Sequence, residues 1–337
     1  MTLPFKTQQK YSALLLFSFS ILILSIIPLY RTFYYNGLPP GETIYSHMFL
    51  GNYILEHGIP TMDPSIALQR PYSLDIFDLL LGILGQYIGM NLAGLVLPFV
   101  LGLLTLFFCY RLFLLILPSK QALLAGVFLV SCPVFLTIFS EATNMALLFP
   151  LLCSGFFFFF QKNWTKYLSF LSFGLLFFSG AIHVLLVILL LLCFSSTKER
   201  PFPADSLMTR IDKKYFMLLL LFLFTLFFGS LLFGGISLQL HTQGLLSLIQ
   251  NFFSDFGGIF GFSVFTVVLA ILSIPTLWKK KMLSPLFCFF FVVLFFLIFF
   301  VSSLYVFYLV PFFAFGALFG FEILVKHQWR LEYLSRI

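Results

Sequence analysis

The sequence predicts an all-α, polytopic membrane protein of about ten transmembrane helices, with a long helical first external loop. The 337 residues are 61% hydrophobic and only 9% charged, whereas soluble globular domains carry about 25% charged residues. In lipid the backbone must satisfy its own hydrogen bonds, so membrane spans are helices or closed barrels. Uninterrupted apolar runs such as 217–233 lack the alternation of barrel strands. Helical spans are therefore expected.

The first expected span covers residues 11–30, and Lys6 and Lys10 precede it. About 20 apolar residues are enough to cross a bilayer. Because no small-residue cleavage site follows the run, we expect a retained helix rather than a signal peptide. The whole chain, 1–337, is predicted to be one integral membrane domain.

Further spans are expected wherever about 20 apolar residues follow one another. They are placed at 92–117, 120–138, 143–160, 215–235, 257–278, 283–302 and 304–325. Two segments are ambiguous. Residues 74–90 could cross the membrane or lie on its surface, and residues 167–195 could cross once or twice, with a turn at 179–183 in the second case.

Basic residues distinguish two topologies. If 74–90 lies at the surface and 167–195 crosses twice, only Arg31 and Arg70 face outside. If 74–90 crosses and 167–195 crosses once, four more basic residues move outside. These are Arg111, Lys120, Lys162 and Lys166. The preference of Lys and Arg for the cytoplasmic side favours the first topology, with ten spans.

This topology predicts a multi-pass plasma-membrane protein with both termini in the cytoplasm. The net charge of +7 then reflects the cytoplasmic bias of basic residues, so we expect the lipid bilayer and no nucleic acid as a partner. Seven acids fall on the outer side. They are Glu42, Glu56, Asp63, Asp75, Asp78, Glu141 and Asp255. Asp75 and Asp78 agree with a surface position for 74–90, because carboxylates on a spanning helix are costly.

The first external loop is predicted to run from residue 31 to 91 and to contain two helices. One covers 42–57, because Glu42 follows Pro-Pro-Gly and suits the positive end of a helix. Gly-Ile-Pro at 58–60 is expected to end this helix. The second helix, at 74–88, is expected to lie on the membrane surface.

Glu42 and Glu141 are the candidate catalytic residues. Glu141 lies in the polar stretch FSEATN between two apolar spans, which the chosen topology places outside. Two carboxylates at one membrane face can abstract a proton from a hydroxyl or hold a divalent cation against a phosphate. The alternative is that both are solvated loop acids, since loops collect charge.

Histidines offer a second set of candidates. His47, His57 and His241 could form a metal site, although their spacing matches no tight ligand motif. His183 lies near the expected outer turn within 167–195, where it could meet water or an anion. The alternative is an interfacial histidine satisfied by its protein neighbours.

Three further patterns predict membrane packing. Residues 235–258 could form an interfacial helix that covers a site or simply rests on the headgroups. Gly316 and Gly320 form a GxxxG pattern, which allows two helices to approach closely. The five cysteines lie in apolar runs without Cys-x-x-Cys spacing and are expected to be buried or lipid-facing packing residues.

Two segments resemble a known family. The run GETIYSHMFLGNYILEHGIPTMDP at 41–64 follows a single first span, and SCPVFLTIFSEATN occupies 131–144. Their order resembles that of the C-type superfamily of integral membrane glycosyltransferases (GT-C). This superfamily includes protein O-mannosyltransferases, aminoarabinose transferases and oligosaccharyltransferase catalytic subunits. The resemblance covers about residues 11–200, whereas residues 201–337 match only in hydrophobicity.

The resemblance implies transfer of a sugar from a polyprenyl-phosphate or pyrophosphate donor to an acceptor at the outer membrane face. It makes Glu42 the general base or metal ligand and Glu141 its supporting acid; a divalent metal ion, if one takes part, would bind to these two. Residues expected to contact the donor phosphate or substrate are His183, Tyr45, His47, Asp63 and Arg70.

Two other hypotheses remain open. One is a transporter or lipid flippase, which would be expected to carry ionisable residues or broken helices at mid-membrane. Pro133 and Pro150 interrupt helices, but no ionisable residue lies at the centre of a predicted span. The other is a catalytically inactive GT-C-like scaffold. Neither the sugar, the acceptor nor the oligomeric state can be predicted from the sequence.

Overall fold

The computed structural model describes most of the chain. It covers residues 5–39, 43–65, 72, 74–141, 143–161, 163–196, 213–234, 252–253, 261–279 and 284–326. Within these ranges the secondary structure is helical, with one isolated bridge between Phe253 and Phe262. The predicted all-α class is therefore confirmed for this part of the chain.

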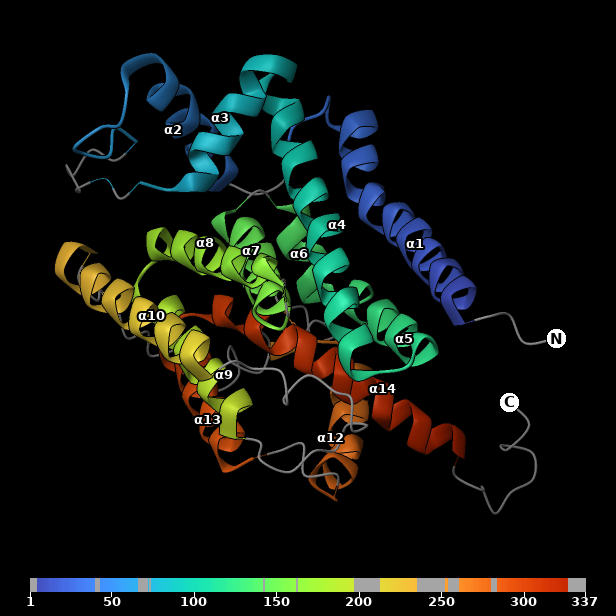
Figure 1. The fold of residues 1–337 in the computed structure, drawn as a ribbon. Helices are drawn as coiled ribbons and strands as arrows, with labels where there is room; N and C mark the ends of the chain where they lie inside the picture. Colours follow the sequence, from blue (N-terminus) through green and yellow to red (C-terminus); the bar gives the residue numbers. More distant parts are fainter. Residues whose placement is uncertain are drawn as a thin grey trace.

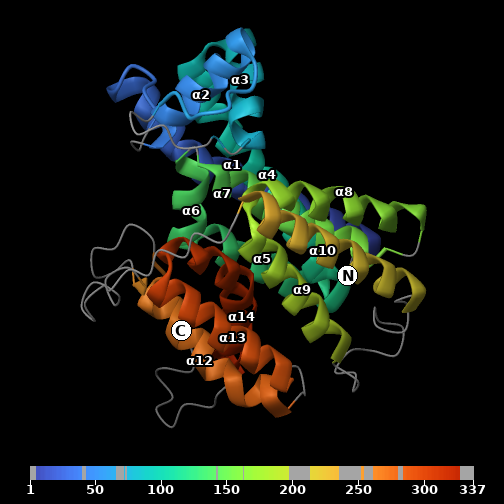
Figure 2. The same ribbon diagram turned by 90° about the vertical axis from the view of Figure 1, so that its left-hand side faces the viewer.

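The N-terminal helices build one end of the molecule. They are α1 (Phe5–Tyr34), α2 (Thr43–His57), α3 (Ile76–Ile88) and α4 (Met90–Ile116). Helices α2 and α3 lie side by side at this end, and α4 leads away from them into the body of the protein (Figures 1 and 2). We call α2 and α3 the end layer.

The remaining helices form the body. In chain order they are α5 (Ser119–Val130), α6 (Pro133–Ser140), α7 (Asn144–Phe159), η1 (Trp164–Tyr167), α8 (Leu168–Leu175), η2 (Leu176–Ser179), α9 (Ala181–Ser196), α10 (Lys213–Gly234), α12 (Val264–Lys279), α13 (Pro285–Phe300), η5 (Ser303–Leu309) and α14 (Val310–Lys326). Helices α12 and α13 lie far from the end layer (Figures 1 and 2).

Local sequence explains several helix boundaries. Helix α2 ends at His57, and the next residue, Gly58, has a φ of +82°, a conformation that favours glycine. Helix α3 begins after Asp75, whose side chain accepts a hydrogen bond from the amide of Phe77. Gly180, with a φ of +105°, separates η2 from α9. The expected helices at 42–57 and 74–88, and the turn within 167–195, are confirmed within a few residues.

The predicted count of ten spans is not confirmed. Four helical segments in the described ranges are long and apolar enough to cross a membrane: Tyr11–Tyr34, Met90–Ile116, Lys213–Leu231 and Tyr305–Val325. A fifth is possible if Ser119–Val130 and Pro133–Ser140, which meet at a 61° bend, count as one broken span. Pro133 begins the second half of this pair, since proline is favoured in the first helical turn and disfavoured within a helix.

Several other expected spans form shorter helices. Helices α7, α9, α12 and α13 have 16 residues each, which corresponds to a rise of about 24 Å. A bilayer core is about 30 Å thick. Helix α3 is shorter still, with 13 residues, in agreement with the topology that leaves 74–90 at the surface.

Apolar side chains cover much of the outside of the molecule. Along α1, Leu14 is 67% exposed, Leu22 63% and Ile26 56%. Exposed apolar surface of this extent is unusual for a soluble monomer and is what a helix presents to lipid. Together with the long apolar helices, it indicates a membrane protein.

Small residues allow close packing inside the body. A side chain at Gly316 would meet Ala270 at 3.2 Å, so α14 and α12 pack closely at the predicted GxxxG pattern. None of the five cysteines, all of which the structure describes, forms a disulfide; Cys288 is exposed and the other four are buried. The Sγ atoms of Cys109 and Cys153 lie 3.3 Å apart between α4 and α7.

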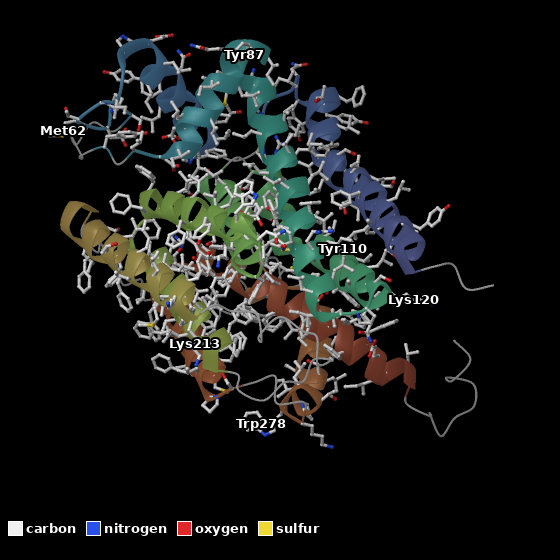
Figure 3. The ribbon with its side chains drawn as sticks, in the orientation of Figure 1. Met62, Tyr87, Tyr110, Lys120, Lys213 and Trp278 are labelled. Atoms are coloured by element: carbon white, nitrogen blue, oxygen red, sulfur yellow. The ribbon has the colours of Figure 1, made fainter. Side chains whose placement is uncertain are left out.

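The ends of the molecule differ in composition. Met62 and Tyr87 lie at the end formed by the end layer, whereas Lys120, Lys213 and Trp278 lie in the opposite half (Figure 3). Lys120 lies near the start of α5, and the favoured topology places it on the cytoplasmic side.

Candidate functional site

Glycine packing sets the geometry of the candidate site in the end layer. A side chain at Gly51 would lie 2.6 Å from the carbonyl oxygen of Asp78, and one at Gly82 would lie 2.5 Å from the carbonyl oxygen of Gly51. The two helices can therefore approach closely only because both positions lack a Cβ. His47 and Asp78 each lie one helical turn before one of these glycines, so the close crossing brings their side chains together.

His47 and Asp78 form a buried pair. The Nδ1 atom of His47 lies 2.5 Å from Oδ1 of Asp78, and Asp78 is only 1% exposed. The hydroxyl of Tyr72 donates a hydrogen bond of 2.9 Å to the other carboxylate oxygen of Asp78. The ring of Phe77 packs edge-on against His47, with 5.4 Å between centroids.

Asp75 completes the cluster and links it to the body. Its carboxylate accepts a hydrogen bond from the amide of Phe77, at 2.9 Å, and the side chain of Asn144 lies near enough to help oppose the rise in its pKa. Asn144 is the first residue of α7 and belongs to the FSEATN stretch. A polar break in the body is thus joined to the first loop, as expected if both lie on one membrane face.

The three side chains can serve as metal ligands. One ligand atom each from His47, Asp75 and Asp78 lies within 4.8 Å of the other two. Among the described residues this is the one group of three or more His, Cys, Asp or Glu side chains with such spacing. We call these three residues the HDD cluster.

Charge and burial alter the acidity of the HDD cluster. Burial raises the pKa of Asp75 to about 6, the charge of Asp78 adds to this rise, and the Phe77 amide partly opposes it. Burial alone would lower the pKa of His47, but its hydrogen bond with Asp78 and the charges of both aspartates outweigh this, so the pKa is raised above 6.5. Negative charge therefore dominates the local electrostatics.

Glu141 follows the last residue of α6 and is partly buried. Burial raises its pKa above the ordinary 4.5, and the positive charge of Arg31 near the end of α1 partly opposes this shift. Glu141 is three residues from Asn144, a separation of at most about 11 Å along the backbone. Glu141 thus lies at the junction of α6 and α7, with Arg31 of α1 as its charged neighbour.

Glu42 and Arg70 lie outside the described residues, so the structure does not place them. The predicted meeting of Glu42 with Glu141 stays a prediction. The expected interfacial helix at 235–258 also falls almost wholly outside the described ranges, and so does His241.

The other predicted contacts have local partners. The hydroxyl of Tyr45 donates to the carbonyl of Pro39 at 3.3 Å. Asp63 accepts hydrogen bonds from the amide and hydroxyl of Ser65, at 2.8 and 2.6 Å, in a tight local turn. His57 is exposed and stacks on Tyr53; it is not part of the HDD cluster.

His183 lies within the body. It is 5% exposed, and its Nδ1 atom forms a 3.0 Å hydrogen bond with the hydroxyl of Tyr308 in η5. The ring of Tyr305 lies 5.4 Å from the imidazole, centroid to centroid. This environment matches the alternative of a histidine satisfied by protein groups. Its predicted role in donor binding stays a prediction.

Sequence reasoning missed the role of Asp75 and Asp78 as partners of His47. Both were interpreted only as acids that disfavour a membrane span. The available signal was their spacing: residues three apart at the start of a helix lie on one face. Tyr72 and Asn144 gave no comparable signal, since only the fold brings them to these carboxylates.

Comparison with known proteins identifies no relative. No protein-family model matches the chain, and no curated protein matches it.

Proposed function

We propose that the protein is a membrane glycosyltransferase that moves a sugar from a polyprenyl-phosphate or pyrophosphate donor to an acceptor at the outer membrane face. The proposal extends the resemblance in the first 200 residues. The observation that supports it best is the proximity of Asn144, the last residue of segment 131–144, to Asp75 at the start of α3, where Asn144 partly opposes the rise in the pKa of Asp75. Helix α3 in turn packs closely against α2, which lies within segment 41–64.

The surroundings suit a donor with a long apolar tail and a charged head. Exposed apolar side chains on α1, such as Leu22 and Ile26, provide a lipid-facing surface for a polyprenyl chain. Near the end of the same helix, Arg31 packs over the ring of Tyr35, with 4.6 Å between Cζ and the ring centroid. The guanidinium of Arg31 can donate hydrogen bonds to a phosphate oxygen of the donor.

Glu141 is the candidate base in the described part of the chain, with Glu42 as its proposed partner. In the reaction, a carboxylate accepts the proton of the acceptor hydroxyl while the acceptor oxygen bonds to the anomeric carbon. The bond between that carbon and the donor phosphate breaks, and the polyprenyl phosphate leaves with the electron pair. The raised pKa of Glu141 suits a base, because proton transfer is most effective when the pKa approaches the working pH.

Transfer of label from a radiolabelled polyprenyl-linked sugar tests the proposal. In membranes that contain the wild-type protein, the radiolabelled sugar should pass from the lipid-extractable fraction, which holds the donor, to the water-soluble or protein fraction, which holds the acceptor. Glu141→Gln and Glu42→Gln should each slow transfer by about 100-fold or more, the usual contribution of general acid–base catalysis. Glu56→Gln is the matched control, because Glu56 lies on α2 and bonds Asn52 locally at 2.7 Å.

Two results would reject the proposal in different ways. Equal transfer by the wild type and both glutamine variants would remove Glu42 and Glu141 from the site. Movement of the intact donor across the bilayer without sugar transfer would favour a lipid flippase. An inactive scaffold predicts neither transfer nor donor movement.

A further inference from the structure

We propose that the HDD cluster binds a divalent first-row transition-metal ion, such as Mn²⁺ or Zn²⁺, through Nδ1 of His47 and carboxylate oxygens of Asp75 and Asp78. This site differs from the Glu42–Glu141 pair that the family resemblance implies. Metal binding here does not depend on sugar transfer, and the two proposals can fail separately.

The spacing of the ligand atoms fits one ion. They lie within 4.8 Å of one another, and ligands bound at about 2.0–2.2 Å from a single metal are themselves about 3–4 Å apart. Nδ1 of His47 and Oδ1 of Asp78, now 2.5 Å apart, would separate by about 0.5–1.5 Å when an ion lies between them. Small side-chain rotations are enough for this change.

The chemical nature of the ligands selects the class of metal. Imidazole nitrogen suits zinc and other first-row transition metals, whereas carboxylate oxygens also suit manganese. One imidazole and two carboxylates therefore favour Zn²⁺ or Mn²⁺ over a purely oxygen-bound ion such as Ca²⁺.

Neighbouring groups hold the ligands in place. Tyr72 donates to the Asp78 oxygen that is not bonded to His47, and the Phe77 amide donates to Asp75. Outer hydrogen bonds of this kind orient metal ligands. A carboxylate offers about four lone-pair sites, so Asp75 keeps capacity for an ion after accepting the bond from Phe77.

The charges at the cluster also favour a cation. Two carboxylates lie close to one imidazole, and one of them, Asp78, is 1% exposed. Within the described ranges, the ion pair recorded for these carboxylates is the one between His47 and Asp78. A divalent ion would balance both negative charges and would tie α2 to the start of α3.

Metal binding to the purified full-length chain tests the inference. The protein, free of any histidine tag, is stripped with EDTA in detergent at pH 7.5 and dialysed against Mn²⁺ or Zn²⁺, and bound metal is measured by mass spectrometry. Wild type should retain about one ion per chain. Asp75→Asn and His47→Gln should each weaken binding at least 10-fold, in line with the loss of one ligand.

His57→Gln is the matched control, because it removes an exposed imidazole from the same helix and should leave binding unchanged. Asp75→Asn keeps the size of the side chain, and elution in gel filtration checks its fold. Absence of stoichiometric metal in the wild type would overturn the inference and leave a plain His–Asp ion pair. So would equal binding by the wild type, Asp75→Asn and His47→Gln.

Discussion

At the scale of single residues, Glu141 combines partial burial with one nearby cation, Arg31. Its pKa is raised because burial disfavours the carboxylate more than Arg31 stabilises it. A folded state that raises a carboxyl pKa binds the proton more tightly than the unfolded chain does. Stability contributed by Glu141 is therefore greatest at low pH and falls as the pH rises from about 4.5 through the raised value.

Replacement of Glu141 by Gln should remove this pH dependence. Glu141→Gln is expected to unfold at a higher temperature than the wild type at pH 7, because the buried charge is gone. The difference should vanish below about pH 4.5, where the wild-type carboxyl is protonated in both states. Thermal unfolding in detergent between pH 4 and 8 measures this difference in unfolding temperature between the variant and the wild type.

The exposed Glu56 provides the control, since an exposed carboxylate contributes little to stability. Glu56→Gln should show a much smaller change across the same pH range. A Glu141→Gln variant that is less stable than the wild type at pH 7, with no trend toward lower pH, would argue against a buried carboxylate at this position.

At the scale of helices, the crossing of α2 and α3 depends on Gly51 and Gly82. We expect Gly51→Ala to lower the free energy of unfolding by about 1–3 kcal/mol, the usual cost of overpacking. The added methyl would lie 2.6 Å from the backbone oxygen of Asp78, and backbone atoms cannot move aside as a flexible side chain can. This loss should exceed the gain of about 1 kcal/mol that alanine brings to a helix.

Gly174→Ala in α8 is the matched control. Its methyl would lie 3.4 Å from the ring of Phe222, an ordinary contact, so this variant should be neutral or slightly stabilising. Chemical unfolding in detergent measures the free energy of unfolding of both variants and of the wild type. Equal stability of Gly51→Ala and Gly174→Ala would show that α2 and α3 do not cross as closely as described.

Helix positions were easier to predict from the sequence than contacts between helices. The polar residues around 42–58 and the acids before 76 identify α2 and α3, because caps and glycines act locally. Pro133 and Gly180 signalled breaks, but several apolar runs form helices of only 16 residues, so the predicted count of ten full spans is not confirmed. Hydropathy measures composition and does not fix where a helix ends.

The HDD cluster could not be predicted for a related reason. His47 and Asp78 are 31 positions apart, and they meet only because two glycines permit a close crossing. Asn144 comes near Asp75 only after the three helices between α3 and α7 have folded. Periodicity within one helix carries no information about such distant contacts.

At the scale of the whole molecule, the end layer and the helices that carry Lys120, Lys213 and Trp278 lie in different halves. Met62 and Tyr87 mark the first end, and Lys120, Lys213 and Trp278 lie in the other half (Figure 3). The proposed function requires the end layer and the FSEATN stretch to share the outer face of the membrane, because a polyprenyl-linked sugar and its acceptor must meet there.

Labelling of single cysteines with a membrane-impermeant maleimide tests this central claim most directly. In a chain whose five native cysteines are replaced by alanine, Met62→Cys and Thr143→Cys should react in intact cells. Trp164→Cys and Trp278→Cys, at positions 73% and 60% exposed, should react only after the membrane is permeabilised. Labelling of Met62→Cys and Thr143→Cys from opposite sides, or of Met62→Cys and Trp278→Cys from the same side, would contradict the account.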